Sequence, residues 1–184
     1  MNSVRIIGGQ WRRRVLRFPE AEGLRPTPDR VRETLFNWLG QDLRGLNCLD
    51  LFAGSGALGF EAASRGAAKV VMVECVPRVL AALEANARML AAGEGLEIVR
   101  ADAVKFAAST ALRFDVLFLD PPYRQGWIER LIPLLPRILA EDAVLYVESE
   151  SAMDACGDWR TVRHGKAGQV FYHLMRRGGP DDAE

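Results

Sequence analysis

Hydrophobic and polar positions repeat with two different periods along most of the chain. From Asn47 onward, short apolar runs typical of buried strands alternate with stretches that carry an apolar residue every three or four positions, as helices do. The expected strands are 48–52, 69–74, 96–100, 114–120 and 143–148, and the expected helices are 57–65, 77–92, 103–109 and 127–139. This alternation predicts a mostly parallel sheet with helices on both faces.

The two ends of the chain depart from this alternation. Residues 3–19 predict two short strands around a Gly-Gly pair. The helix expected next has Thr27 as its cap, Pro28 at its first position and Gly40 at its end. Residues 159–177 predict an antiparallel hairpin at the sheet edge. The expected fold is therefore α/β and Rossmann-like: a mostly parallel seven-stranded sheet with an antiparallel edge hairpin, preceded by a small β-hairpin and a helix.

The composition is that of one globular domain. The chain has 184 residues, of which 49% are hydrophobic and 26% charged. Its three cysteines, Cys48, Cys75 and Cys156, are far apart, which argues against disulfides and a structural zinc site and fits a reducing compartment. The first residues lack the apolar core of a signal peptide, and no apolar run approaches the ~20 residues of a membrane span. We therefore expect a cytoplasmic protein without a membrane segment.

Charge is unevenly distributed although the formal net charge is zero. Residues 1–44 hold nine arginines and five acidic residues, whereas residues 45–159 hold ten basic and sixteen acidic ones. Residues 160–184 hold five basic residues and three acidic ones, all three within the last four positions. The basic ends suggest a polyanionic partner, although an ordinary solvated surface explains the charge equally well.

Glycines and carboxylates gather where the first two parallel strands are expected to end. Asp50 is followed by glycines at 54, 56 and 59, which let the backbone turn tightly and approach a ligand closely. Such a loop by itself is also explained as a tight strand-to-helix turn. Glu74, at the end of the next strand, is placed to accept hydrogen bonds from ribose hydroxyls, which both NAD and S-adenosylmethionine offer.

Two further carboxylates follow the third and fourth strands. Asp102 is placed to accept from an adenine amino group, or to cap the following helix. Asp120-Pro121-Pro122-Tyr123 is the most specific motif. Both prolines lack a backbone donor but keep their carbonyls as acceptors. A carboxylate and a rigid carbonyl together suit the two protons of an NH₂ group, and an aromatic ring beside them suits stacking on a base.

These motifs occur in the order typical of class I S-adenosylmethionine-dependent methyltransferases, and the tetrapeptide from Asp120 resembles that of enzymes methylating base amino groups. The amino-terminal runs from Arg5 (RIIGG) and from Arg25 (RPTPDRVRETLFNWL) resemble the RsmD family. The resemblance extends to about Arg177. It implies S-adenosylmethionine as cofactor and transfer of its methyl group to N2 of one guanine in small-subunit (16S) rRNA.

The resemblance also implies roles for individual residues. The expected catalytic residues are Asp120, Pro121, Pro122 and Tyr123. The expected cofactor-binding residues are Arg25, Thr27, Asp50, Phe52, Ala53, Gly54, Ser55, Gly56, Glu74, Cys75, Asp102, Ala103 and Asp120. No metal is expected. For Thr27 and Arg25, helix capping and a plain surface arginine are the alternatives.

The basic amino-terminal hairpin is a candidate RNA-binding surface. The residues expected to hold phosphates or stack on a base are Arg5, Trp11, Arg12, Arg13, Arg14 and Arg17. We expect residues 1–44 to form an extension covering substrate and cofactor, residues 45–177 to form the methyltransferase domain and residues 178–184 to form a flexible tail. The expected partner is ribosomal RNA within the small subunit or an assembly particle, bound by a monomer.

Three other functions fit parts of this pattern. A DNA methyltransferase acting on adenine N6 or cytosine N4 uses the same tetrapeptide, but the ~50 residues outside the core are too few for a large target-recognition domain. A nicotinamide-dependent oxidoreductase fits the glycine loop and Glu74 but leaves Asp120 to Tyr123 without a role. A non-catalytic RNA-binding assembly factor is the third alternative.

Overall fold

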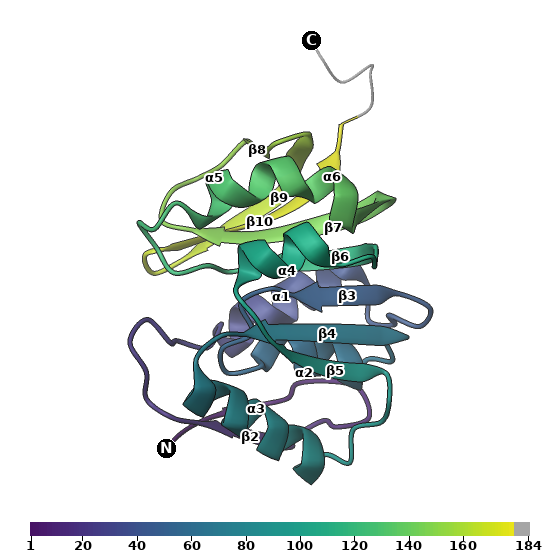
Figure 1. The fold of residues 1–184 in the computed structure, drawn as a ribbon, viewed down its shortest axis with the longest axis vertical. Coiled ribbons are helices and arrows are strands. Elements are labelled where there is room, and N and C mark those ends of the chain that lie inside the picture. The colour runs from purple at the N-terminus through teal and green to yellow at the C-terminus, as the bar shows by residue number, and fades with distance from the viewer. Residues whose placement is uncertain (179–184) are drawn as a thin grey trace.

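The fold is built on a mixed eight-stranded sheet with helices on both faces (Figure 1), and the computed structural model describes residues 1–178. The strands are β1 Asn2–Arg5, β2 Val15–Phe18, β3 Asn47–Asp50, β4 Lys69–Glu74, β5 Leu96–Arg100, β6 Phe114–Leu119, β7 Leu139–Ser149, β8 Ala155–Cys156, β9 Trp159–Ala167 and β10 Val170–Arg177. The helices are α1 Asp29–Leu39, α2 Ala57–Ser64, α3 Pro77–Met89, α4 Ala103–Ser109, α5 Trp127–Leu131, the 3₁₀ turn η1 Ile132–Leu134 and α6 Leu135–Ile138.

The sheet has the order β5-β4-β3-β6-β7-β10-β9-β8. Strands β3 to β7 are parallel to their neighbours, and β10, β9 and β8 continue the sheet antiparallel. A separate antiparallel pair, β1 and β2, forms the amino-terminal hairpin. The predicted α/β class, the parallel core and both hairpins are therefore confirmed.

Two details differ from the sequence-based expectation. The sheet has an eighth strand, β8, which is only two residues long and therefore carries no detectable alternation. The helix expected over 127–139 is divided into α5, η1 and α6. Pro133 and Pro136 lie at the starts of the second and third pieces, where a residue without an N–H interrupts the helical hydrogen-bond ladder.

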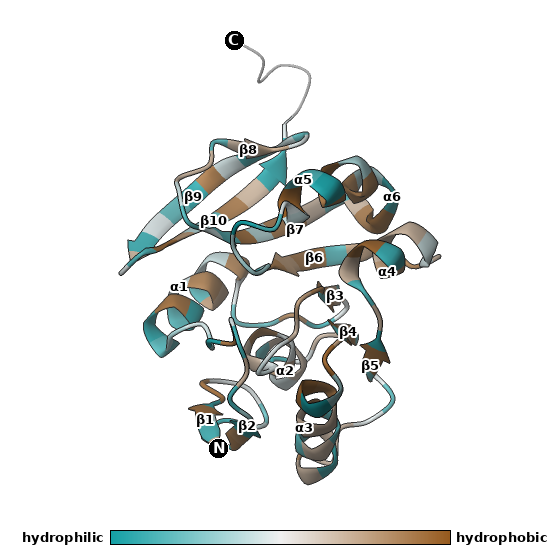
Figure 2. Ribbon diagram, turned by 60° about the vertical axis from the view of Figure 1, so that its left-hand side comes forward, coloured by the Kyte–Doolittle hydropathy of each residue, from teal (hydrophilic) through white to brown (hydrophobic). Residues whose placement is uncertain are grey.

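The sheet separates two hydrophobic clusters. Successive residues of β6 point to opposite sides: Val116 and Phe118 join the cluster beneath α1, α2 and α3, and Leu117 and Leu119 join the cluster beneath α4, α5 and α6. Burial on both faces explains why the parallel strands read as continuous apolar runs. Figure 2 shows the visible ends of β3 and β4 and much of β6 in the brown of hydrophobic residues.

Helix α1 begins differently from the prediction. Its first residue is Asp29, its N-cap is Pro28, and no side chain caps it. The predicted capping role of Thr27 is therefore wrong: its hydroxyl, which is buried, donates a 2.7 Å hydrogen bond to Oε1 of Glu148. As a cap, the hydroxyl would accept from a backbone N–H of the helix, whereas here it donates to a carboxylate, and hydrogen bonds to an ionised acceptor are the stronger ones. Gly40 ends the helix with φ of 97°, as predicted.

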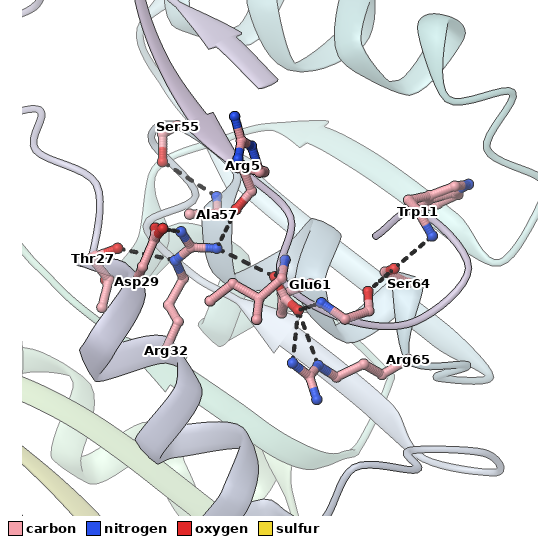
Figure 3. A network of polar contacts seen from close by, with 12 residues as sticks. Arg5, Trp11, Thr27, Asp29, Arg32, Ser55, Ala57, Glu61, Ser64 and Arg65 are labelled. Carbon is pink, nitrogen blue, oxygen red and sulfur yellow. Dashed lines mark hydrogen bonds and ion pairs between the residues drawn. The ribbon is translucent and has the colours of Figure 1, made fainter. Parts of the chain in front are cut away.

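The amino-terminal segment is attached to the sheet domain through the fully buried carboxylate of Glu61 on α2 (Figure 3). The backbone N–H groups of Ile7 and Gly8 donate to its two oxygens at 2.9 and 2.8 Å. Arg32 donates at 3.3 Å, and Arg65 donates through Nε at 3.0 Å. Two guanidinium groups and two amides thus satisfy one buried charge.

Arg32 extends this network toward the loop that precedes its own helix. Its side chain is fully buried and donates to the carbonyl oxygens of Thr27 at 3.0 Å and Arg5 at 2.9 Å, and it also pairs with Asp29. The backbone of residues 25–29 is therefore tied to both the hairpin and α2 (Figure 3).

Residues 1–44 share the hydrophobic cluster of the sheet, to which Leu16, Val31 and Leu35 contribute beside Cys48 and Met72. The assignment of these residues as a covering unit stays a prediction. The predicted flexible tail, 178–184, lies outside the described residues except for Gly178. Within residues 1–178, no helix is long and apolar enough to cross a membrane.

We expect Glu61→Ala to lower the free energy of unfolding by about 3–5 kcal/mol, because it leaves two buried guanidinium groups and two amides without their acceptor. Urea unfolding monitored by circular dichroism measures this loss. Glu84→Ala, on the exposed face of α3, is the matched control and should cost less than about 0.5 kcal/mol. Equal losses in the two variants would contradict the role given to Glu61.

Candidate active site

Strand register places the candidate site along the carboxyl ends of the parallel strands, the side of the sheet that we call its edge. Met72, Asp50, Phe118 and Tyr146 form one row across the adjacent strands β4, β3, β6 and β7. Two residues further along three of these strands are Glu74, Asp120 and Glu148. Because side chains two positions apart point to the same face, these three carboxyl groups face the side of α2 and the amino-terminal segment. The register thus brings together residues up to 98 positions apart in sequence, from Asp50 to Glu148.

The loop after β3 has the tight backbone that its glycines predicted. Gly54 and Gly56 have φ of 52° and 83° in the left-handed region. A Cβ on Gly56 would lie 2.5 Å from the ring of Phe60, and one on Gly54 would lie 2.7 Å from Leu24 of the amino-terminal segment. The loop therefore has room only for glycine at these two positions.

Asp50 and Glu74 hold this loop from two strands. Asp50 is 2% exposed and accepts a 3.0 Å hydrogen bond from the N–H of Gly59 in the first turn of α2. Glu74 accepts the N–H groups of Gly54, Cys75 and Val76, each at 3.0 Å. Glu74 is partly exposed, and both of its carboxylate oxygens accept backbone N–H groups.

The other predicted cofactor-binding residues lie around this loop. Asp102 is the N-cap of α4 and accepts from the N–H of Lys105 at 3.0 Å. The alternative capping role is therefore confirmed, and it occupies one of the two carboxylate oxygens. Phe52 packs edge-on against Trp127 with ring centroids 5.3 Å apart, and the hydroxyl of Ser55 accepts from the N–H of Ala57 at 3.3 Å. Ala53 and Ala103 are buried, and Cys75 and Arg25 are exposed.

The Asp120 to Tyr123 motif follows β6 directly. Pro121 is buried, Pro122 is exposed and Tyr123 is 39% exposed, so the motif runs from the interior to the surface. Arg124 has φ of 62° and pairs with Glu150 at 3.2 Å, which ties the loop after β6 to the end of β7. An exposed aromatic ring thus lies beside a partly buried carboxyl group.

Sequence reasoning missed Glu148. It is 5% exposed near the end of β7, and its Oε1 accepts from Thr27 at 2.7 Å and from the hydroxyl of Tyr146 at 2.8 Å. Its side chain neighbours that of Asp120, because each lies two positions beyond the paired residues Phe118 and Tyr146. Its position after the apolar run 143–147 was the available signal, because it marks the end of the fifth parallel strand.

Burial and the charges of neighbouring acids raise the pKa values of Asp50, Asp120 and Tyr123. Burial raises the pKa of Asp50 to about 7, the hydrogen bond from Gly59 opposes this, and the charges of Glu74 and Glu148 add to it. Burial, followed by the charge and hydrogen bond of Glu148, raises the pKa of Asp120 well above its usual value. Burial and the neighbouring acids also raise the pKa of Tyr123 to about 12. The site therefore holds protons more tightly than exposed acids do.

The predicted RNA-binding residues divide into two groups. The side chains of Arg5, Arg12, Arg13, Arg14 and Arg17 are exposed. Trp11, in contrast, is 9% exposed and belongs to the hydrophobic cluster, and its backbone N–H donates to Ser64 at 2.9 Å. The predicted stacking role of Trp11 is therefore wrong, because the ring is used in packing the hairpin. Among residues 1–178, no three His, Cys, Asp or Glu side chains are grouped to hold a metal ion.

Comparison with known proteins gives a consistent result. Residues 4–176 match the model of the family described as Conserved hypothetical protein 95. The chain is 45% identical to "Ribosomal RNA small subunit methyltransferase D" of Escherichia coli (strain K12), covering 98% of this chain and 94% of that protein. It is 46% identical to the solved structure of the Escherichia coli protein yhhF, with a TM-score of 0.86 over 97% of this chain and 99% of that chain.

A more distant structure shares the fold alone. The RNA methyltransferase from Salinibacter ruber, solved in complex with S-adenosyl-L-homocysteine, is 19% identical with a TM-score of 0.67. The alignment covers 87% of this chain and 99% of that one.

The raised pKa of Asp50 predicts a specific pH dependence of stability. The folded state binds the Asp50 proton up to about pH 7, whereas an unfolded chain releases it near pH 4, so stability falls as pH rises through this window. Asp50→Asn removes this cost and keeps an acceptor for Gly59. We expect the stability of Asp50→Asn relative to the parent to increase from pH 4 to pH 8, by on the order of a few kcal/mol.

Urea unfolding at intervals of one pH unit tests this expectation. Asp142→Asn, an exposed change on β7, is the control and should track the parent at every pH. A constant difference between Asp50→Asn and the parent would show that Asp50 titrates normally in the folded protein.

Proposed function

The chain belongs to the family described as Conserved hypothetical protein 95, and from this membership and the site geometry we propose that it methylates ribosomal RNA with S-adenosylmethionine as methyl donor. We propose further that the target is the exocyclic N2 amine of a guanine in small-subunit (16S) rRNA. The observation that carries the proposal is the position of Asp120 to Tyr123 beside the glycine loop and Glu74, at one edge of the parallel sheet.

The residues around the glycine loop fit the proposed methyl donor. Gly54 and Gly56 give the loop its tight left-handed backbone, and Glu74 is the carboxylate proposed to accept from ribose hydroxyls. The free oxygen of Asp102 and the N–H of Ala103 are the groups proposed for the adenine. When bound, S-adenosylmethionine supplies a methyl group on a positively charged sulfur. The carboxylate of Glu74, which lies at the glycine loop, suits a cationic ligand.

The Asp120 motif would bind the amine that receives the methyl group. In the proposed arrangement, the Asp120 carboxylate and the Pro121 carbonyl accept the two amine protons and direct the nitrogen lone pair toward the methyl group. Asp120 then takes the proton that the amine must lose. The partly exposed ring of Tyr123 stacks on the base and fixes its approach. Because the amino group must contact Asp120 and Pro121 directly, the base must be unpaired or flipped out of its helix.

The exposed arginines of the amino-terminal hairpin are proposed to hold RNA phosphates. Arg12, Arg13 and Arg14 lie in the turn between β1 and β2, with side chains open to solvent. Arg32 ties the hairpin to α1 through the carbonyl of Arg5, and Thr27, just before α1, contacts Glu148. RNA bound by the hairpin would therefore lie near the site. The proposed substrate is the small ribosomal subunit or an assembly particle, bound by a monomer.

A methyl-transfer assay with identification of the labelled nucleoside tests the reaction. We expect label from S-adenosylmethionine to appear in N2-methylguanosine when the protein acts on small subunits lacking base methylation. Asp120→Ala should reduce the rate at least about 100-fold while RNA binding is retained, because the amine loses both its acceptor and its base.

The other outcomes separate the alternatives. Label in methylated adenine or cytosine of duplex DNA would replace the RNA assignment by DNA methylation and keep the role of Asp120. RNA binding without any transfer, in a parent protein that binds the methyl donor, would favour the assembly-factor function.

Salt dependence tests the hairpin. Replacing Arg12, Arg13 and Arg14 by glutamine should lower the slope of log affinity against log salt by about 2 to 3, if each arginine neutralises one phosphate. Filter binding of ribosomal RNA at several salt concentrations measures the slope. Arg113→Gln is the control, because Arg113 directly precedes β6 and therefore lies at the amino ends of the parallel strands, away from the site. An unchanged slope in the triple variant would place the RNA elsewhere.

A further inference from the structure

Glu148 has no role in the reaction as described so far, although it is buried beside the proposed base. It lies at the same row of the sheet as Asp120, because Phe118 pairs with Tyr146 and each carboxyl residue follows two positions later. Glu148 is 5% exposed, and the register makes it the neighbour of Asp120 on the adjacent strand. Two neighbouring carboxyl groups form a hydrogen bond to each other only when one of them carries a proton.

The donors around Glu148 decide which of the two groups is the acceptor. The hydroxyls of Thr27 and Tyr146 both donate to Oε1 of Glu148, at 2.7 and 2.8 Å. Two hydroxyl donors hold the Glu148 carboxylate in one orientation and satisfy its charge in a buried position. Glu148 is thus held as an acceptor, and Asp120 is the neighbouring group that can donate to it after taking a proton.

We propose that Glu148 is the positioning residue of Asp120: it accepts a hydrogen bond from Asp120 once Asp120 has taken the proton released by the base amine. This inference rests on the proposed methyl transfer. A nitrogen–methyl bond forms as the methyl–sulfur bond breaks, with its electron pair remaining on sulfur. The amine proton moves to a carboxylate oxygen of Asp120, and the resulting O–H donates to Glu148.

The electrostatic consequence is a stronger base at Asp120. The negative charge of Glu148 raises the pKa of Asp120, after burial itself. A general base is most effective when its pKa lies near the working pH, which an ordinary aspartate does not reach. The charge of Asp50 also raises the pKa of Asp120. The other titratable groups that face the pair are Tyr123 and Tyr146, whose own pKa values are raised by burial and by the charges of Asp120 and Glu148.

The pair also links the proposed base to the amino-terminal segment. Thr27 reaches Glu148 across 121 positions of sequence, and its backbone carbonyl is held by Arg32. The docked segment therefore supplies one of the two donors that orient Glu148. A structural role for Thr27 alone would not require its hydroxyl to face a carboxylate at the sheet edge.

The test compares Glu148→Gln with the parent by two measurements. The first is a ¹³C NMR titration of the aspartate carboxyl groups, with Asp120 assigned through Asp120→Asn. We expect Asp120 to titrate above the ordinary aspartate range in the parent and at least about one pH unit lower in Glu148→Gln, because the neighbouring negative charge is gone. Glu141→Gln, an exposed change at the other end of β7, should leave the titration unchanged.

The second measurement is the pH profile of single-turnover methyl transfer at saturating donor. The acidic limb reports protonation of Asp120, so we expect it to shift to lower pH in Glu148→Gln by the same amount as the NMR titration. The plateau rate should fall about 10-fold or more, because Asp120 is then a weaker base. Affinity for S-adenosylmethionine should stay within about twofold, because a general base acts on the transition state and the glycine loop is untouched.

The outcomes are separable. An unchanged Asp120 titration in Glu148→Gln would overturn the inference, whether or not the parent methylates RNA. A shifted titration with an unchanged pH profile and rate would overturn the catalytic role of the pair. A shifted titration in a parent that methylates no RNA would reject the proposed function and keep the pairing of the two carboxyl groups. If Glu148→Gln fails to fold, Glu148→Asp keeps the charge, and an Asp120 titration between that of the parent and the ordinary aspartate range supports the inference; one in the ordinary range overturns it.

Discussion

The carboxylate of Glu61 is the interaction on which the arrangement of the site depends. It is fully buried on α2 and is satisfied by two arginines and two backbone amides, none of which belongs to the sheet. A charge in such a position is tolerated only when its partners are present, so the amino-terminal segment must dock for the domain to be stable. Docking places Leu24 against Gly54 and Thr27 against Glu148. The same carboxylate that stabilises the fold therefore closes one side of the candidate site.

The parallel sheet supplies the second constraint, which is the alignment of acids at its edge. Glu74, Asp120 and Glu148 lie two positions beyond one row of paired residues, and Asp50 lies within that row. Gathering acids in a partly buried place costs stability, as the raised pKa values of Asp50 and Asp120 show. Proteins depart from favourable electrostatics mainly where function requires it. In the proposed reaction, the raised pKa of Asp120 would make its carboxylate a stronger base for the amine proton.

Features of the molecule that depend on neighbouring residues were predictable from the sequence, whereas contacts between distant residues were not. The strands and the glycine loop were predictable because burial on both faces and left-handed backbone leave local signatures. Helix 127–139 was predicted as continuous although Pro133 and Pro136 divide it, since its apolar period outweighed the two prolines. Thr27 was assigned to a helix cap and Trp11 to RNA stacking because each role fits its neighbours in sequence. In the folded protein, Thr27 instead donates to Glu148, and Trp11 packs in the hydrophobic cluster with its N–H bound to Ser64. Each of these partners lies more than 50 positions away in sequence.

By itself, the sequence determined the fold class, the family resemblance and the motifs that end each parallel strand, because periodicity and short motifs act over a few residues. Only the tertiary structure decided which side chains meet. Register across β4, β3, β6 and β7 placed Glu148 beside Asp120, and the docking of residues 1–44 brought Thr27 to the same place. Contacts of this kind depend on the packing of distant segments, and hydrogen bonds between buried groups form wherever that packing brings a donor to an acceptor. A single sequence carries no local sign of them.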